Sequence, residues 1–206
     1  MAIVVVGGHS RSVGKTSVVA GLISAIPERR WTAVKITQYG HGICSANGED
    51  CDCATADHSW AMTEESDRSG ISDTSRFLVA GAERSLWVRT RQGNLAEAMP
   101  SLRQALEDAA DVIIESNSVM KFVRPDLYLT VLDYETVDFK PSAREYLDLA
   151  SAVILHEPAE AMPAWSGVSL KLIAGKPVFR VRPPQYVSED VIEFVRAKLG
   201  EVAIPS

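Results

Sequence analysis

A segment near the start of the chain constrains the fold more strongly than any other part of the sequence. It reads Gly-His-Ser-Arg-Ser-Val-Gly-Lys-Thr-Ser over residues 8–17, closely after the apolar run Ile3 to Val6. An amphipathic helical pattern begins at Lys15. An apolar strand, a loop with glycines and a helix, in this order, are the context of a phosphate-binding P-loop. The segment therefore predicts a nucleoside triphosphate site and a fold arranged around it.

The residue types in this loop fit the chemistry of phosphate binding. Backbone N–H groups of such a loop bind phosphate oxygens. We expect Lys15 to reach the β- and γ-phosphates and the Thr16 hydroxyl to hold Mg²⁺. The standard motif has a glycine at the position of His9, so the spacing here is one residue longer. The other predicted nucleotide contacts are Gly8, His9, Ser10, Arg11, Ser12, Val13, Gly14 and Ser17.

A later apolar run ends in a carboxylate. Residues 111–115 read Asp-Val-Ile-Ile-Glu, which predicts a buried strand with Glu115 at its carboxyl end. Ligands gather at this end of parallel strands, so we expect Glu115 to hold Mg²⁺ or to polarise the attacking nucleophile. The alternative is that Glu115 only terminates the strand. Asn117 and Ser118 are further candidates for phosphate or water contacts, and Asp133 is a weaker candidate for the role of Glu115.

Short apolar runs alternate with longer helical patterns along the rest of the chain. This alternation predicts an α/β fold with three layers (αβα), a mostly parallel sheet of about seven strands and a single domain over residues 1–206. The expected strands are Ile3 to Val6, Thr32 to Ile36, Arg84 to Arg89, Val112 to Glu115, Leu127 to Leu132, Ala152 to Leu155 and Pro177 to Val181. The expected helices are Lys15 to Ile26, Asp73 to Ala80, Leu95 to Ala109, Ser142 to Ala150 and Glu189 to Leu199.

The segment from about residue 38 to residue 71 interrupts this alternation. It is polar and contains all three cysteines, and we expect an irregular insertion near the nucleotide. Thiolates and imidazoles are the usual ligands of zinc, and three thiolates also suit an iron–sulfur cluster. A redox-active cysteine pair and unliganded thiols are the alternatives. The predicted metal ligands are Cys44, Cys51 and Cys53, with His41 or His58 as the fourth.

The composition of the chain limits the kinds of partner that the protein can bind and the cellular compartment in which we expect it. A net charge of −6 argues against a nucleic-acid-binding face, and 46% apolar with 23% charged residues is a globular composition. The N-terminus has no basic region, and no stretch approaches the ~20 apolar residues of a membrane span. We therefore expect a cytoplasmic protein without membrane contact. In a reducing compartment, its cysteines would be thiols or metal ligands.

Three segments resemble known families. The longer loop spacing resembles dethiobiotin synthetase and its relatives, in the P-loop class that includes the signal-recognition and nitrogenase-iron-protein ATPases. The second lysine of that class is missing, since Ser10 and Arg11 stand in this stretch. Over residues 3–133 the chain also resembles the adaptor proteins of molybdopterin-guanine dinucleotide biosynthesis. These pair a strand-end lysine, here Lys35, with a "K-D-S-x-R…A-G-A" helix. The matches to that helix are Asp73, Ser75, Arg76, Ala80, Gly81 and Ala82.

The resemblance implies a protein that binds GTP or ATP with Mg²⁺, hydrolyses it slowly, acts on a partner enzyme and forms a homodimer. The family's glycine after the Walker glutamate is replaced by Ser116. No Asn-Lys-x-Asp motif for guanine follows the sixth expected strand; His156 and Glu157 there are candidates for base or substrate contact, or plain surface residues. The alternative function is a small-molecule kinase or ATP-dependent ligase of the dethiobiotin-synthetase type, with residues 38–71 as a substrate lid.

Overall fold

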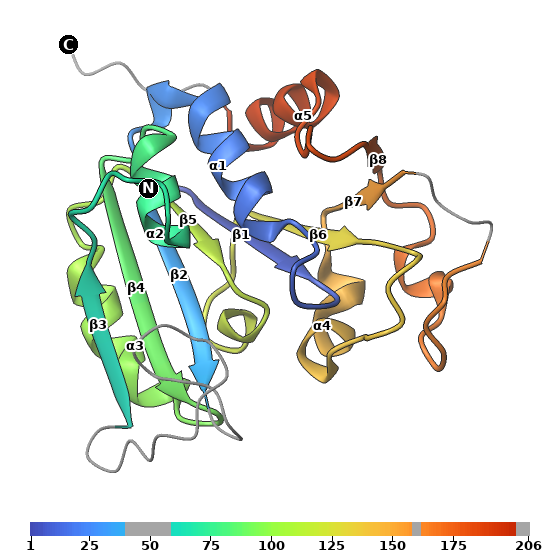
Figure 1. Ribbon diagram of the computed structural model, residues 1–206, viewed down its shortest axis with the longest axis horizontal. Coiled ribbons are helices and arrows are strands. Elements are labelled where there is room, and N and C mark those ends of the chain that lie inside the picture. The colour runs from blue at the N-terminus through green and yellow to red at the C-terminus, as the bar shows by residue number, and fades with distance from the viewer. Residues whose placement is uncertain (40–58, 158–161, 201–206) are drawn as a thin grey trace.

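The strand that precedes the P-loop lies inside a mostly parallel sheet. The computed structural model describes residues 1–39, 59–157 and 162–200, and within them eight strands form one sheet in the order β3-β4-β2-β5-β1-β6-β7-β8. Only β3, at one edge, is antiparallel to its neighbour (Figure 1). The strands are β1 (Ile3–Gly8), β2 (Trp31–Tyr39), β3 (Trp60–Glu64), β4 (Arg84–Arg91), β5 (Asp111–Glu115), β6 (Leu127–Leu132), β7 (Ala152–His156) and β8 (Val178–Val181).

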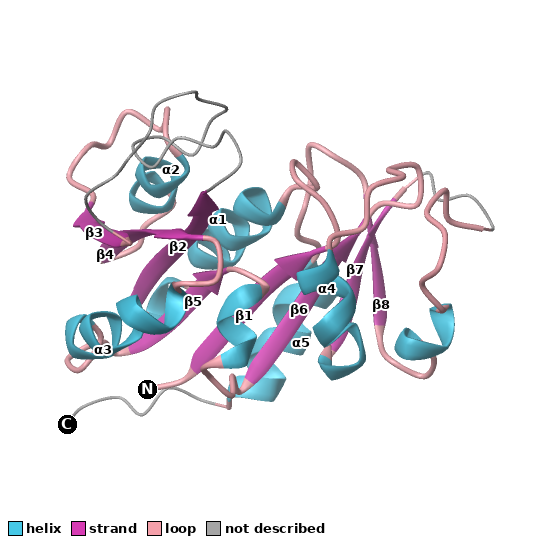
Figure 2. Cartoon of the chain, turned by 90° about the horizontal axis from the view of Figure 1, so that it is seen from below, coloured by secondary structure: helices cyan, strands magenta, loops and turns pink. Residues whose placement is uncertain are grey.

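Helices cover both faces of the sheet (Figure 2). The α-helices are α1 (Lys15–Ala25), α2 (Asp73–Val79), α3 (Leu95–Ala105), α4 (Pro141–Tyr146) and α5 (Glu189–Leu199). Short 3-10 turns are η1 (Pro27–Arg29), η2 (Ser118–Lys121), η3 (Leu147–Leu149) and η4 (Leu170–Ile173). The predicted three-layer α/β fold is thus confirmed. No helix in the described ranges is both long and apolar enough to cross a membrane.

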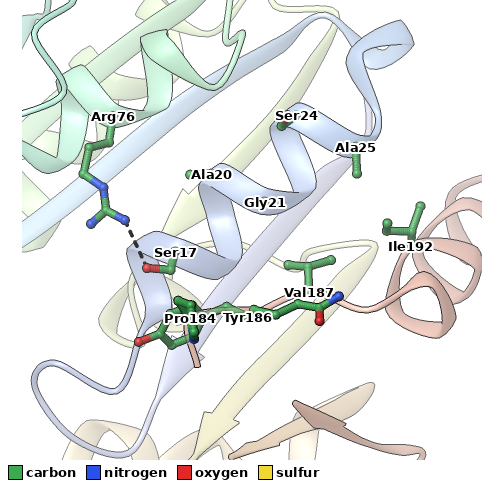
Figure 3. A pocket seen from close by; sticks show the side chains of 11 residues that line it. Ser17, Ala20, Gly21, Ser24, Ala25, Arg76, Pro184, Tyr186, Val187 and Ile192 are labelled. Atoms are coloured by element: carbon green, nitrogen blue, oxygen red, sulfur yellow. Dashed lines mark hydrogen bonds between the residues drawn. The ribbon is translucent and has the colours of Figure 1, made fainter. Parts of the chain in front are cut away.

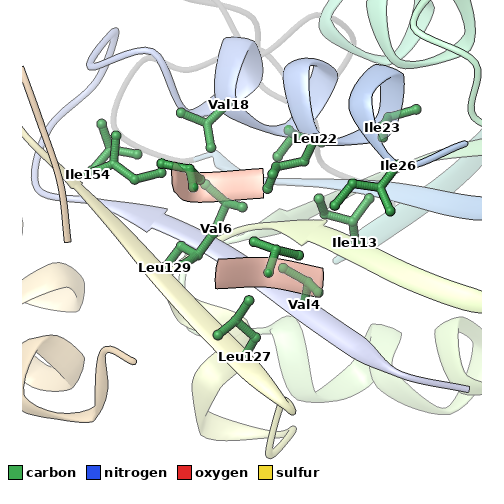
Figure 4. Close-up of a cluster of buried hydrophobic side chains, with 14 of the residues drawn as sticks. Val4, Val6, Val18, Leu22, Ile23, Ile26, Ile113, Leu127, Leu129 and Ile154 are labelled. Atoms are coloured by element: carbon green, nitrogen blue, oxygen red, sulfur yellow. The ribbon is translucent and has the colours of Figure 1, made fainter. Parts of the chain in front are cut away.

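Each face of the sheet has its own apolar core. On one face, α1, α2 and α5 pack over alternate residues of the central strands, such as Val4 and Val6 of β1 (Figure 4). On the other face, Val5 of β1 packs with residues of α3. Because successive residues of a strand point to opposite faces, a strand covered on both sides has to be apolar throughout. The apolar runs in the sequence identified the central strands for this reason.

Two parts of the prediction differ from the structure. The sheet has eight strands where about seven were expected, because β3 lies in the segment 38–71 that was expected to be irregular. Trp60 and Met62 of β3 pack against the core on the α3 side, whereas Thr63 and Ala61 alternate with them. The expected helix from Ser142 to Ala150 also divides into α4 and the turn η3.

The order of the strands brings the predicted site residues to one edge. β1 pairs with β5 on one side and with β6 on the other. The strands β2, β4 and β3 lie beyond β5, whereas β7 and β8 lie beyond β6, so the strand order changes direction at β1. At such a switch in strand order, the loops after adjacent strands separate and leave room for a ligand at the carboxyl ends. The P-loop follows β1 at this switch.

Candidate nucleotide-binding site

The loop after β1 has the backbone conformation of a phosphate-binding loop. Gly14, the residue before α1, is left-handed at φ 81°, and Ser12 is also left-handed at φ 55°. The first hydrogen bond into the helix runs from Val18 N–H to the Gly14 carbonyl, at 2.9 Å. The N–H groups of the first turn, Lys15 to Ser17, therefore have no acceptor within the helix. Together with the positive end of the helix dipole, they form a binding site for an anion.

The imidazole of His9, one of the predicted nucleotide contacts, is packed within the fold in this structure. It is fully buried, and its ring lies 5.2 Å from the ring of Phe139 and 4.8 Å from that of Trp165. Nδ1 is 2.7 Å from the Asp138 carbonyl, and Nε2 accepts a hydrogen bond from Asp133 N–H at 3.1 Å. This pattern requires the neutral ring with its proton on Nδ1. Burial lowers the pKa of His9, which favours the same state.

The backbone N–H and carbonyl groups of His9 also form hydrogen bonds within the fold. Its N–H donates to the Val131 carbonyl at 3.2 Å, and its carbonyl accepts from Lys140 N–H at 2.7 Å. The residue thus extends the contact between β1 and β6 by one position, and the loop proper begins at Ser10. This accounts for a motif one residue longer than the standard one.

Asn117 supports the start of the loop instead of contacting phosphate. Its Oδ1 accepts from Gly8 N–H and its Nδ2 donates to the Gly8 carbonyl, both at 2.9 Å. The two bonds take the place of strand pairing where β5 has already ended. The close approach also explains Gly7, since a Cβ there would lie 2.2 Å from Asn117 Oδ1. The predicted role of Asn117 is therefore corrected to a structural one.

Lys15 reaches back across the loop. Its Nζ donates a hydrogen bond to the Ser10 carbonyl at 2.7 Å. Burial is the main cause that lowers the pKa of Lys15, from 10.5 to about 8, while the carboxylate of Glu115 partly offsets this effect. The ammonium group lies in a position of low solvation, where a phosphate group would be a much better partner than a single carbonyl.

Four side chains from four elements converge beside the start of α1. Thr16 Oγ1 donates to Glu115 Oε2 at 2.8 Å. Lys35 Nζ lies 2.5 Å from Glu115 Oε1, 2.8 Å from Asp73 Oδ2 and 3.4 Å from Thr16 Oγ1. Burial by itself would lower the pKa of Lys35, but the two carboxylates outweigh burial and raise it. Lys35 therefore keeps its positive charge.

This group has the donor chemistry of a magnesium site. A threonine hydroxyl and carboxylate oxygens are hard ligands of the kind that Mg²⁺ prefers, and Mg²⁺ usually takes only one or two carboxylates besides phosphates and water. Across residues 1–39, 59–157 and 162–200, no cluster of three or more His, Cys, Asp and Glu side chains is placed to hold a metal. Asp73 was identified from sequence only within the helix motif. Its position at the first turn of α2 brings its carboxylate to Lys35.

A hollow of about 430 Å³ lies along α1, where it is lined by residues from Ser17 to Ala25 (Figure 3). Arg76 of α2 donates to Ser17 Oγ at 3.0 Å on one side of it. Tyr186, from the segment between β8 and α5, lies on the other side. A Cβ on Gly14 would lie 2.2 Å from the Tyr186 ring, so the tyrosine packs directly on the helix start. The lining includes Ser17, Gly21, Arg76, Pro184, Tyr186 and Val187.

The remaining candidates have other surroundings. His156 is largely buried behind Tyr186, with ring centroids 5.5 Å apart, and burial lowers its pKa. Glu157 pairs with Arg182 at 3.2 Å on the surface. Asp133 accepts from Thr136 Oγ1 at 2.7 Å and so closes a turn.

The predicted metal ligands of the insertion, His41, Cys44, Cys51, Cys53 and His58, lie outside the described residues. Their zinc or iron–sulfur site stays a prediction from sequence. Elemental analysis of the purified protein, with a variant carrying serine at all three cysteines, would test it.

No family model and no curated protein sequence matches the chain. Solved structures with some similarity include HypB from Helicobacter pylori in complex with nickel, at 14% identity and a TM-score of 0.48, over 96% of this chain and 85% of that one. "Apo" LpxK from Aquifex aeolicus in complex with ATP has 17% identity and a TM-score of 0.49, over 87% of this chain and 53% of that one. The Signal Recognition Particle 54 kDa protein from Aeropyrum pernix K1 in complex with GDP has 17% identity and a TM-score of 0.45, over 97% of this chain and 46% of that one.

The chain thus spans about half the length of the last two proteins. Similarity at this level gives no information about activity.

Proposed function

We propose that this protein binds a Mg²⁺–nucleoside triphosphate, ATP or GTP, at the P-loop, hydrolyses it slowly and acts as a nucleotide-dependent adaptor for a partner enzyme. The observation that carries the proposal is the convergence of Lys15, Thr16, Lys35, Asp73 and Glu115 at the first turn of α1. These residues come from four segments of the chain, and a purely structural loop would not need two buried lysines next to free helix N–H groups.

The phosphates would lie over the N-terminus of α1. The N–H groups of the first turn would bind phosphate oxygens, and the Lys15 ammonium group would exchange the Ser10 carbonyl for them. Thr16, Asp73 and Glu115 would hold Mg²⁺, which would neutralise phosphate charge. Without the ion, the ammonium group of Lys35 keeps the two carboxylates together. It would remain beside the phosphates as a second positive charge.

The nucleoside would extend into the hollow beside α1. A volume of about 430 Å³ is of the size of sites for small ligands, and the hollow begins at Ser17, directly after the predicted magnesium ligand Thr16. The aromatic ring of Tyr186 offers an apolar surface for a base. The proposal includes both ATP and GTP, because no described contact of the residues at the end of β7 distinguishes the two bases.

Slow hydrolysis is implied by the sequence resemblance, and Glu115 is the residue proposed to act in it. Both oxygens of its carboxylate already accept hydrogen bonds, one from Thr16 and one from Lys35. In the proposed complex Mg²⁺ would replace the contact with Thr16, and we expect turnover to stay low until a partner enzyme binds. The assignment to molybdenum cofactor biosynthesis rests only on the sequence resemblance over residues 3–133.

Calorimetric titration of the protein with ATP and GTP, in Mg²⁺ and in excess chelator, tests the proposal. We expect binding that requires Mg²⁺ for full affinity and that Lys15→Ala abolishes. The exposed Lys171, outside the site, provides the matched control Lys171→Ala, which should bind like the wild type. Equal affinity in Lys15→Ala and wild type would rule out the P-loop as the site. Turnover that appeared only with a small-molecule acceptor would favour the kinase or ligase.

A further inference from the structure

The segment that joins β6 to α4 is fastened to the P-loop. Ser10 Oγ donates to Asp138 Oδ2 at 2.8 Å, and the His9 ring is bound to the Asp138 carbonyl at 2.7 Å. Two residues later, Lys140 N–H donates to the His9 carbonyl at 2.7 Å. These three bonds fix the backbone of Lys140 directly beside the beginning of the loop. A lysine side chain starting there is long enough to cover the loop.

The side chain of Lys140 lies close enough to Lys15 and Lys35 for their charges to act on one another. It is partly buried, and burial and the positive charge of Arg11 lower its pKa. The negative charge of Asp138 partly offsets this effect, the charges of Lys35 and Glu115 also act on Lys140, and its own charge helps to lower the pKa of Lys15. Within the described ranges, no hydrogen bond or ion pair of its ammonium group is found, and Asp138 Oδ2 is engaged by Ser10. A partly buried ammonium group without a partner is unfavourable unless an anion binds to it.

We propose that Lys140 binds the terminal phosphate of the bound nucleoside triphosphate and so supplies the second lysine that this P-loop lacks. The inference rests on the proposed function, because it needs a triphosphate on the loop. The hollow for the nucleoside lies beside α1, whereas α4, which follows Lys140, lies on the other side of the sheet (Figure 1). A nucleotide with its base in the hollow and its phosphates over the start of α1 would then have its terminal phosphate on the side of Lys140.

The test compares triphosphate with diphosphate binding in the variant Lys140→Met. We expect its affinity for Mg²⁺–ATP or Mg²⁺–GTP to fall roughly tenfold or more, the effect of losing one charge-assisted hydrogen bond. Affinity for the corresponding diphosphate should change less than about twofold. Lys140→Arg should retain most of the triphosphate affinity, since it keeps the charge. The control Lys171→Met should behave like the wild type.

The melting temperature of each variant separates binding from folding. Only the backbone of Lys140 is bonded to the loop, so Lys140→Met should melt within about 2 °C of the wild type. If it does not fold, Lys140→Gln takes its place in the same comparison with Lys140→Arg.

Equal losses of triphosphate and diphosphate affinity would mean that Lys140 acts on the shape of the loop, and would overturn the inference. Unchanged triphosphate affinity would overturn it as well, with the proposed function intact. A wild-type protein that binds neither nucleotide would overturn both.

Discussion

The ammonium group of Lys15 is withdrawn from water in the folded protein, where it donates a hydrogen bond to the Ser10 carbonyl. Burial lowers its pKa from 10.5 to about 8. Between these two values the unfolded chain binds more protons than the folded one, so the free energy of unfolding rises with pH in this interval. Phosphate binding needs the charged form and follows the opposite trend. Lys15 therefore contributes to binding at some expense of stability, which is common for residues of functional sites.

Nucleotide affinity should accordingly fall as the pH rises above about 8, because Lys15 then loses its proton before the nucleotide binds. A bound phosphate would raise the pKa of Lys15, so binding near pH 8 should take up protons. Calorimetry in two buffers of different ionisation enthalpy measures this uptake directly. Constant affinity from pH 7 to pH 9.5, with no proton uptake, would contradict the low pKa of Lys15.

Glu115 is the second residue whose role a single substitution isolates. Glu115→Gln keeps the shape of the side chain but removes the charge that holds Lys35 and the proposed Mg²⁺. We expect hydrolysis to fall tenfold or more, the typical contribution of a positioned acid or base, while nucleotide still binds. Phosphate release by the purified variant measures this. Glu83→Gln is the control, since Glu83 pairs with the exposed Arg30 away from the site. Unchanged turnover would reduce Glu115 to a structural strand end.

At the scale of elements, the sequence was most informative where one physical requirement decides the residue types. Strands covered on both faces must be apolar throughout, so β1, β5, β6 and β7 could be predicted from their apolar runs. β3 could not, because a short edge strand needs only Trp60 and Met62 to face the core, and it lies in a polar segment. The P-loop was predicted because its residues are contiguous.

The parts of the site that sequence did not assign depend on contacts between elements. The sequence around Asn117 does not indicate that its side chain binds the backbone of Gly8. The sequence around Lys140 likewise does not indicate that its backbone N–H binds the His9 carbonyl. Such roles follow from the order of strands in the sheet, which a single sequence does not encode in a visible pattern. The same holds for Asp73, which reaches Lys35 only because α2 follows the edge strand β3 and returns over β2.

The brace formed by Asn117 gives a prediction at the scale of elements. Asn117→Ala leaves the buried N–H and carbonyl groups of Gly8 without partners, which should lower the free energy of unfolding by about 2 kcal/mol. It should also weaken nucleotide binding, because the loop begins at this junction. Gln104→Ala is the control, since Gln104 is an exposed residue of α3, and its effect should stay below about 0.5 kcal/mol. Urea unfolding measures both. Equal stability of the two variants would show that the junction does not need the brace.

At the scale of the whole molecule, the site joins segments that are far apart in the chain. The P-loop follows β1, Lys35 lies on β2, Asp73 begins α2 and Glu115 ends β5. The parallel sheet brings these positions to one edge, since the carboxyl ends of its strands meet there. The segment before α5 adds Tyr186 on one side, and the segment before α4 adds Lys140 on the other. A bound nucleotide would therefore connect elements from both faces of the sheet.

Hydrogen exchange followed by mass spectrometry should make this connection visible. A ligand that binds only the folded state slows the local opening of the segments it touches. A Mg²⁺–nucleoside diphosphate should therefore protect residues 8–17, 72–79 and 182–188. The triphosphate should protect residues 133–140 in addition, because only its terminal phosphate reaches Lys140. Residues 95–105 of α3 lie on the far side of the core from the hollow and serve as the internal control. Equal protection of residues 133–140 by diphosphate and triphosphate would contradict the proposed orientation of the phosphate chain. Protection of α3 to the same degree as the loop would point instead to general stabilisation of the fold.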